Sequence, residues 1–220
     1  MSAHCTGKMW YLIAVLVLVL ALAFLPFLFP KDDCRVLSSR QLKDGTTLEI
    51  VDDQCKEGMP HTTTSTTVRM TQSIADSAKY EEIMTHERVH LDQKTRPAFW
   101  KELVKRVWAY EVLSAPPKGV PNQWTLRPNP DTDACPWSLW RGRYVFFAAY
   151  GEDRRLATAR THVWDLEEGR LAPTPPEWRG QFCVEGVCPQ QDEHPYEIAA
   201  EFITHKSQSP ASAALSSALG

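Results

Sequence analysis

The spacing of hydrophobic and polar residues changes several times along this chain, and each pattern predicts an element. Residues 46–51 follow an Asp-Gly turn signal and residues 61–70 are rich in threonine, so both segments predict strands. Residues 80–93 predict a helix with one buried side. Pro97 begins another helix, whose apolar residues repeat at helical spacing to about Leu113.

The second half of the chain is less regular. Prolines interrupt residues 115–137, which predicts a long irregular excursion. The apolar run 144–150 fits a buried strand or a buried helix, because its length does not decide between them. Residues 154–168 are expected to be helical, and Pro195 to begin a further helix. The Ser- and Ala-rich residues 207–220 are expected to form a flexible tail.

An uncharged apolar run from Met9 to Phe29 is long enough to cross a bilayer as one helix. We therefore expect a short cytoplasmic N-terminus at 1–8, a transmembrane anchor at 9–29 and a single domain at 31–206. A cleaved signal peptide is the alternative, since Ala21-Leu22-Ala23 fits a cleavage site, but the chain stays apolar beyond it.

Charge and cysteine patterns disagree about the side of the membrane on which the domain lies. More Lys and Arg residues follow the apolar run than precede it, which favours the cytoplasm, but this rule is weak before a long domain. The cysteine spacings predict two disulfides in an oxidising compartment. We therefore expect a single-pass cell-membrane protein with an extracytoplasmic domain. The candidate disulfide cysteines are Cys34 with Cys55 and Cys183 with Cys188, whereas Cys135 is left over and Cys5 stays reduced.

Net charge limits the possible partners. A formal net charge of −3 over 220 residues gives no general attraction to nucleic acid. The basic stretch between Lys94 and Arg106 is explained by a solvated helix face. We therefore expect no nucleic-acid partner, and the oligomeric state is not predicted.

Residues His86-Glu87-Arg88-Val89-His90 match the HExxH pattern of zinc hydrolases. Residues i and i+4 of a helix share one face, so His86 and His90 can ligate one ion. Glu87 lies about 100° around the helix from His86. Its carboxylate can take the proton of a metal-bound water without binding the ion itself. An ordinary exposed helix is the alternative.

A third ligand has to come from another part of the chain, and residues 194–201 offer the best one. Pro195 begins a helix on which Glu197 and Glu201 lie at i and i+4. One carboxylate can bind the metal while the other accepts a hydrogen bond from a ligand histidine. Either glutamate can take either role, His194 and His162 are further ligand candidates, and a solvated acidic face is the alternative.

The HERVH motif followed by a helical Glu-x-x-x-Glu resembles the gluzincin branch of zinc metallopeptidases. The resemblance implies an α+β, zincin-like domain after the transmembrane helix, with an edge strand before the motif on which a peptide substrate lies extended. It implies Zn²⁺ as cofactor and a residue that stabilises the oxyanion. The implied residues are His86, His90 and Glu197 as metal ligands, Glu87 as general base, Glu201 as the acid that orients a ligand, and Tyr196 or His194 as oxyanion stabiliser, with Tyr144 and Tyr150 as further candidates.

The expected function is that of a membrane-anchored zinc metallopeptidase, a hydrolase that cleaves peptide bonds in a peptide or protein substrate. Two alternatives stay open: a non-catalytic membrane-anchored module with a structural zinc or no metal, and a cell-wall peptide amidase. The chain has no Gly-x-Ser-x-Gly, P-loop or dinucleotide fingerprint, so those chemistries have no support.

Overall fold

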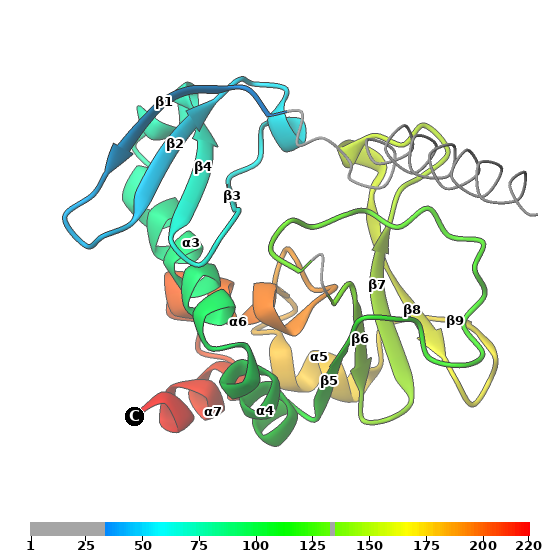
Figure 1. Ribbon diagram of the computed structural model, residues 1–220. Coiled ribbons are helices and arrows are strands. Elements are labelled where there is room, and N and C mark those ends of the chain that lie inside the picture. Colours follow the sequence, from blue (N-terminus) through cyan, green and yellow to red (C-terminus); the bar gives the residue numbers. More distant parts are fainter. Residues whose placement is uncertain (1–33, 133–134) are drawn as a thin grey trace, which may run out of the picture. The chain divides into compact units, whose positions relative to one another are not determined.

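The computed structural model describes residues 34–132 and 135–220. The predicted cytoplasmic segment 1–8, the predicted span 9–29 and Cys5 lie outside the described residues. The chain divides into a unit Met1–Cys34 and a unit Arg35–Gly220, and the elements below belong to the second. That unit contains two small β-sheets with helices, as Figure 1 shows.

The first sheet has the strand order β1-β2-β4-β3. Strands β1 (Val36–Gln41) and β2 (Thr47–Val51) form an antiparallel hairpin, β2 runs parallel to β4 (Thr67–Thr71), and β3 (His61–Thr62) is an antiparallel edge strand on β4. The predicted strand at 46–51 is confirmed. The predicted strand at 61–70 is two strands, because the chain turns between residues 62 and 67.

Helices α2 (Gln72–Ala75) and α3 (Tyr80–Thr95) follow β4. Helix α3 begins where the sequence predicts and continues two residues beyond Gln93. It packs on the first sheet because apolar side chains alternate on the strands and meet the helix on one face. This cluster consists of Leu48, Ile50, Val68, Met70, Met84 and Leu91.

Helix α4 (Pro97–Trp108) begins at Pro97 as predicted, and its apolar stripe is buried. It ends five residues before Leu113, because Ala109 adopts a left-handed backbone conformation with φ of 58°. The chain then continues as strand β5 (Tyr110–Leu113).

The second sheet is an antiparallel meander with the order β5-β6-β7-β8-β9. Its later strands are β6 (Trp137–Trp140), β7 (Tyr144–Ala149), β8 (Arg160–Asp165) and β9 (Arg170–Ala172). Strand β7 resolves the ambiguous run at 144–150. The predicted helix at 154–168 is wrong: after a short 3₁₀ turn, residues 160–165 pair with β7 along its whole length.

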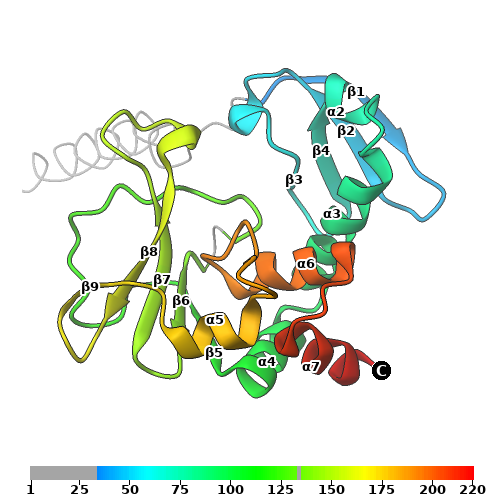
Figure 2. The same cartoon turned by 180° about the vertical axis from the view of Figure 1, so that it is seen from behind.

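Three further helices, α5 (Pro176–Phe182), α6 (Pro195–His205) and α7 (Pro210–Leu219), pack around an aromatic core that includes Trp108, Trp178 and Phe182. Figure 2 shows α6 between the two sheets, beside α3. The flexible tail predicted at 207–220 is wrong. Trp108 Nε1 donates to the carbonyl of Ala211 at 2.9 Å, and Leu215 is buried, so α7 belongs to the core.

The cysteines of the described residues follow the sequence prediction. Cys183 and Cys188 form a disulfide. Cys34 and Cys55 are disulfide-bonded as well, and Cys135 is free. All four cysteines that were predicted to form disulfides are therefore disulfide-bonded.

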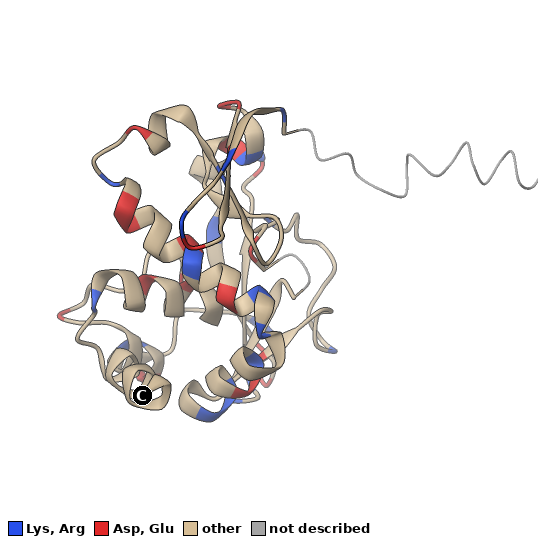
Figure 3. Ribbon diagram, turned by 60° about the vertical axis from the view of Figure 1, so that its left-hand side comes forward, with Lys and Arg blue, Asp and Glu red and all other residues tan. Residues whose placement is uncertain are grey.

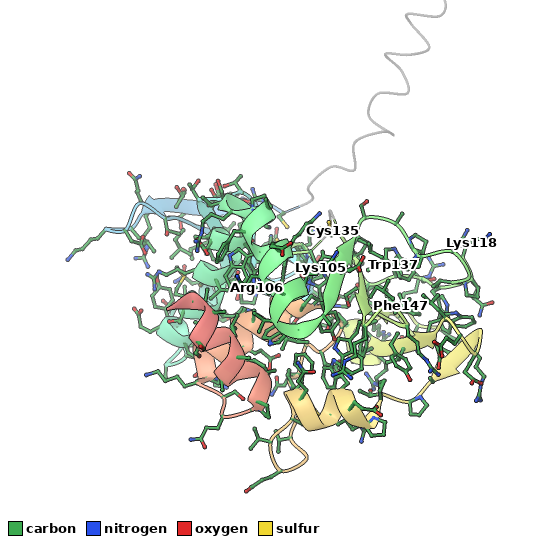
Figure 4. All side chains as sticks on the ribbon, turned by 90° about the horizontal axis from the view of Figure 1, so that it is seen from below. Lys105, Arg106, Lys118, Cys135, Trp137 and Phe147 are labelled. Carbon is green, nitrogen blue, oxygen red and sulfur yellow. A yellow bond between two sulfur atoms is a disulfide. The ribbon has the colours of Figure 1, made fainter. Side chains whose placement is uncertain are left out.

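Charged residues of both signs are interspersed along the helices, as Figure 3 shows. Lys105 and Arg106, labelled in Figure 4, are exposed on α4, and Lys105 Nζ lies 3.8 Å from Glu111 Oε1. The basic stretch of the sequence thus lies partly on a solvated face that also carries acidic groups.

In the part of the chain that the structure describes, no helix has both the length and the apolar character needed to cross a membrane. The span predicted at 9–29 falls outside these residues. The α+β part of the expected fold class is confirmed, with two small sheets in place of one.

Candidate metal site

Helix α3 contributes His86, Glu87 and His90 to the candidate site. The helix lies between the first sheet and α6, so it is packed on two sides. Several of its buried residues are nevertheless polar. Glu87, His90 and Gln93 are buried on it, at 3 %, 1 % and 2 % exposure. Burying such groups is costly unless they are paired, hydrogen-bonded or bound to a metal, so these side chains need partners from other elements.

Helix α6 contributes Glu197. Pro195 occupies its first turn, and the side chain of His194 caps the helix by accepting a hydrogen bond from Tyr196 N–H at 3.2 Å. Glu197 lies in the first turn, where the helix dipole favours a negative charge. It is 1 % exposed and therefore faces the protein interior.

Three side-chain atoms from the two helices converge. His86 Nε2 and His90 Nε2 each lie 3.2 Å from Glu197 Oε2, and the two nitrogens are 3.0 Å apart. Two ligands of a tetrahedral zinc ion, each about 2.0–2.1 Å from it, would be about 3.3 Å apart. The donor set and its spacing therefore fit a zinc ion with three protein ligands.

Two amide side chains form hydrogen bonds with these candidate ligands. Gln93 Nε2 donates to the carbonyl of Tyr196 at 3.1 Å, so its Oε1 is left to accept from His90 Nδ1 at 2.7 Å. This contact puts the proton on Nδ1 of a neutral His90 and leaves the lone pair on Nε2. Asn129 Nδ2 donates to Glu197 Oε1 at 2.7 Å.

Glu201 has a different position from the one that the resemblance implied. Its carboxylate accepts hydrogen bonds from the backbone N–H groups of Gln190 and Gln191, at 2.9 and 2.7 Å. It holds the loop before α6, and its carboxylate is bonded there instead of to a ligand histidine. Of the two helical glutamates, Glu197 is the one whose carboxylate meets the histidines.

The electrostatics of the cluster favour a positive charge between its members. Burial alone would lower the pKa of His90, but the charges of Glu197 and Asp131 and the hydrogen bond to Glu197 raise it to about 10. Burial would raise the pKa of Glu197, but the neighbouring His90 and the hydrogen bonds from both histidines hold it well below its usual value. The three groups can therefore hold a cation, either a proton or a metal ion.

Glu87, the candidate general base, is buried next to the ligand candidate His86. Its Oε2 is buried and has no hydrogen-bond partner among residues 34–132 and 135–220. Burial, together with the negative charge of Asp131, raises the pKa of Glu87 well above its usual value. An unpaired buried carboxyl group costs about 1–3 kcal/mol. Its position next to a ligand-like cluster is typical of a functional acid or base.

His194 and Tyr196, the oxyanion candidates, lie side by side with ring centroids 4.9 Å apart. His194 Nε2 and Tyr196 Oη are both buried without a hydrogen-bond partner within the described residues. His162, a ligand candidate from the sequence, lies instead on β8 against Phe147 of β7 and Trp124 of the irregular excursion. It is absent from the described cluster of ligand-like atoms.

The edge strand β3 is covered at Thr62. Asp131 Oδ1 accepts from the backbone N–H of Thr62 at 3.0 Å, and Lys94 Nζ donates to the Thr62 carbonyl at 2.6 Å. These backbone groups are therefore not free to pair with an added strand. An extended peptide would have to displace Asp131 and Lys94 or bind next to them.

Gln93, Asn129 and Asp131 also belong to the site, and none of them was predicted as a site residue from the sequence. Gln93 lies three residues after His90, so the i, i+3 spacing was an available signal. Asn129 and Asp131 lie in the proline-interrupted excursion, where no periodicity shows which side chains turn inward.

No protein-family model, curated protein or solved structure matches this chain. The expectation of a zincin-like fold rested on two short segments and is corrected accordingly: the protein is α+β with a four-stranded and a five-stranded sheet, and no zincin fold is identified for it.

Proposed function

We propose that this protein is a zinc-dependent peptidase whose metal ligands are His86, His90 and Glu197. The observation that carries the proposal is the convergence of two imidazole nitrogens and one carboxylate oxygen within 3.2 Å, although His86 and Glu197 are 111 residues apart in the chain. Bound zinc would supply a water of lowered pKa and polarise the peptide carbonyl.

The residues of the chain have separate tasks in this proposal. Gln93 fixes the tautomer of His90, so that Nε2 is available to the metal. Glu87 takes the proton of the attacking water, because its buried Oε2 has no competing hydrogen-bond donor among the described residues. His194 and Tyr196 are proposed as donors to the developing oxyanion, since both carry a buried polar atom without a partner in the described chain. The extracytoplasmic location remains a prediction, supported by the Cys183–Cys188 disulfide.

Zinc content and hydrolysis of a synthetic peptide mixture, measured together, test this function. We expect one zinc ion per chain in the wild type and in Glu87→Gln, and loss of zinc in His86→Ala. Hydrolysis should fall by about 10²–10⁴-fold in Glu87→Gln, because the general base is removed while the ligands stay. Retention of zinc with loss of turnover separates catalysis from a structural metal.

Two control variants accompany the test. His205→Ala removes an exposed histidine of α6, and Glu81→Gln neutralises an exposed glutamate of α3, so both should keep zinc and activity. A wild type without zinc after reconstitution would refute the metal site. Unchanged hydrolysis in Glu87→Gln would refute the role of that residue.

A further inference from the structure

A third segment reaches the candidate metal site in addition to α3 and α6. Residues 127–132 bring the side chain of Asn129 into the interior, where it is 5 % exposed. Asn129 Nδ2 donates to Glu197 Oε1 at 2.7 Å, whereas Glu197 Oε2 faces the two histidines. The two oxygens of one carboxylate thus have different partners.

The orientation of the Asn129 amide follows from its surroundings. Its Oδ1 accepts a hydrogen bond from Asp131 N–H at 3.0 Å, which forms an Asx turn. The amide nitrogen, a donor only, is consequently directed at the carboxylate. Pro128 and Pro130 flank the residue and restrict the backbone on both sides.

The segment is held in place by contacts that do not involve Glu197. Arg127 Nη1 and Glu193 Oε1 form an ion pair at 3.2 Å, with both side chains 8 % exposed. At the other end, Asp131 accepts from Thr62 N–H, and Lys94 Nζ donates to the Pro130 carbonyl at 3.1 Å. Asn129 therefore approaches Glu197 from a fixed position.

We propose that Asn129 is a positioning residue that turns Glu197 so that it ligates the metal through Oε2 alone. The inference rests on the proposed zinc site. Ligation through one oxygen of Glu197 and one nitrogen of each histidine would leave a bound zinc ion with a ligand position open, as a catalytic site requires. Without the Asn129 hydrogen bond, Oε1 would be free to turn toward the metal and compete for that position.

The test compares Asn129→Ala and Asn129→Ser in the full chain. Serine can still accept from the backbone N–H two residues on, which keeps the turn, but is too short to reach Glu197. Zn²⁺ affinity is measured by competition with a chromogenic chelator, and ligand geometry by the visible absorption of the Co²⁺-substituted protein. Both variants should bind Zn²⁺ about 10–100-fold more weakly, with altered Co²⁺ bands. Asn122→Ala, at an exposed asparagine of the same excursion, should match the wild type in both measurements.

The outcomes separate this inference from the proposed function. A wild type that binds no Zn²⁺ overturns both. A wild type that binds Zn²⁺, with Asn129→Ser unchanged in affinity and Co²⁺ spectrum, overturns the positioning role alone. Weaker Zn²⁺ binding with an unchanged Co²⁺ spectrum would assign Asn129 to loop packing and also overturn the positioning role.

Discussion

At the residue scale, His194 shows how burial sets the charge of a side chain. The residue is 1 % exposed, and its Nδ1 accepts the N–H of Tyr196 at the start of α6. Burial lowers the pKa of His194 to about 4, although the charge of Glu197 acts in the opposite direction. The ring is therefore neutral at neutral pH, which is the form that can cap the helix.

This neutral cap predicts a pH-dependent contribution to stability. The pKa of His194 is about 4 in the folded protein and about 6.5 in an unfolded chain. The contribution is therefore complete above pH 6.5 and is lost as the pH falls toward 4, by on the order of 3 kcal/mol. His194→Asn keeps a capping acceptor without a titrating ring. Between pH 6.5 and 4, the free energy of unfolding measured with urea should fall less in this variant than in the wild type. An equal fall in both proteins would show that His194 does not cause this pH dependence.

At the element scale, the junction between α4 and β5 depends on one backbone conformation. Ala109 has φ of 58° and ψ of 34°, and its N–H bonds back to the carbonyls of Val104 and Lys105. This left-handed cap ends the helix and lets the chain enter β5 one residue later. A side chain at such a position is strained, whereas glycine adopts the conformation freely.

The same substitution should consequently have opposite effects at the two ends of α4, at its C-cap residue Ala109 and at Ala98 in its first turn. Ala109→Gly relieves the left-handed strain and should raise the free energy of unfolding by up to about 1 kcal/mol. Ala98→Gly, at an exposed position in the first turn of the helix, should lower it by up to about 0.5 kcal/mol. Urea unfolding of both variants shows whether the free energy of unfolding rises or falls in each. A destabilised Ala109→Gly would show that the junction is not strained.

At the scale of the whole molecule, the candidate site lies between two hydrophobic clusters of the unit Arg35–Gly220. Helix α3 packs on the first sheet through Met84 and Leu91. Helix α6 belongs to the aromatic core with strands of the second sheet, through Ile198 and Phe202. A metal held by His90 and Glu197 would therefore link the two cores across the α3–α6 contact.

This link predicts that zinc stabilises the entire unit Arg35–Gly220. A ligand that binds only the folded state, at 100 times its Kd, adds about 2.7 kcal/mol to the free energy of unfolding. Zn²⁺ should raise the Tm of the wild type and leave the Tm of Glu197→Ala unchanged. Mg²⁺ should have no effect, because it prefers oxygen ligands. If the midpoint of thermal unfolding of the wild type were the same with and without Zn²⁺, the proposed link between the two cores would be contradicted.

Local signals in the sequence determined the parts of the site that lie within one element. The spacing of His86 and His90, with apolar residues behind them, predicted α3, and Pro195 predicted the start of α6; both helices are confirmed. The cysteine spacing predicted the Cys183–Cys188 disulfide. Each feature depends on residues a few positions apart, whose relative geometry the backbone period fixes.

Tertiary structure decided what depends on residues distant in the chain. Residues 160–165 are a strand because β7 offers them a hydrogen-bonding edge, although their sequence favoured a helix. Glu201 bonds to a nearby loop, and Asn129 reaches Glu197 across 68 positions. The sequence determined which groups could ligate a metal, and long-range packing alone determined which of them meet, because such contacts depend on how whole elements are placed in space.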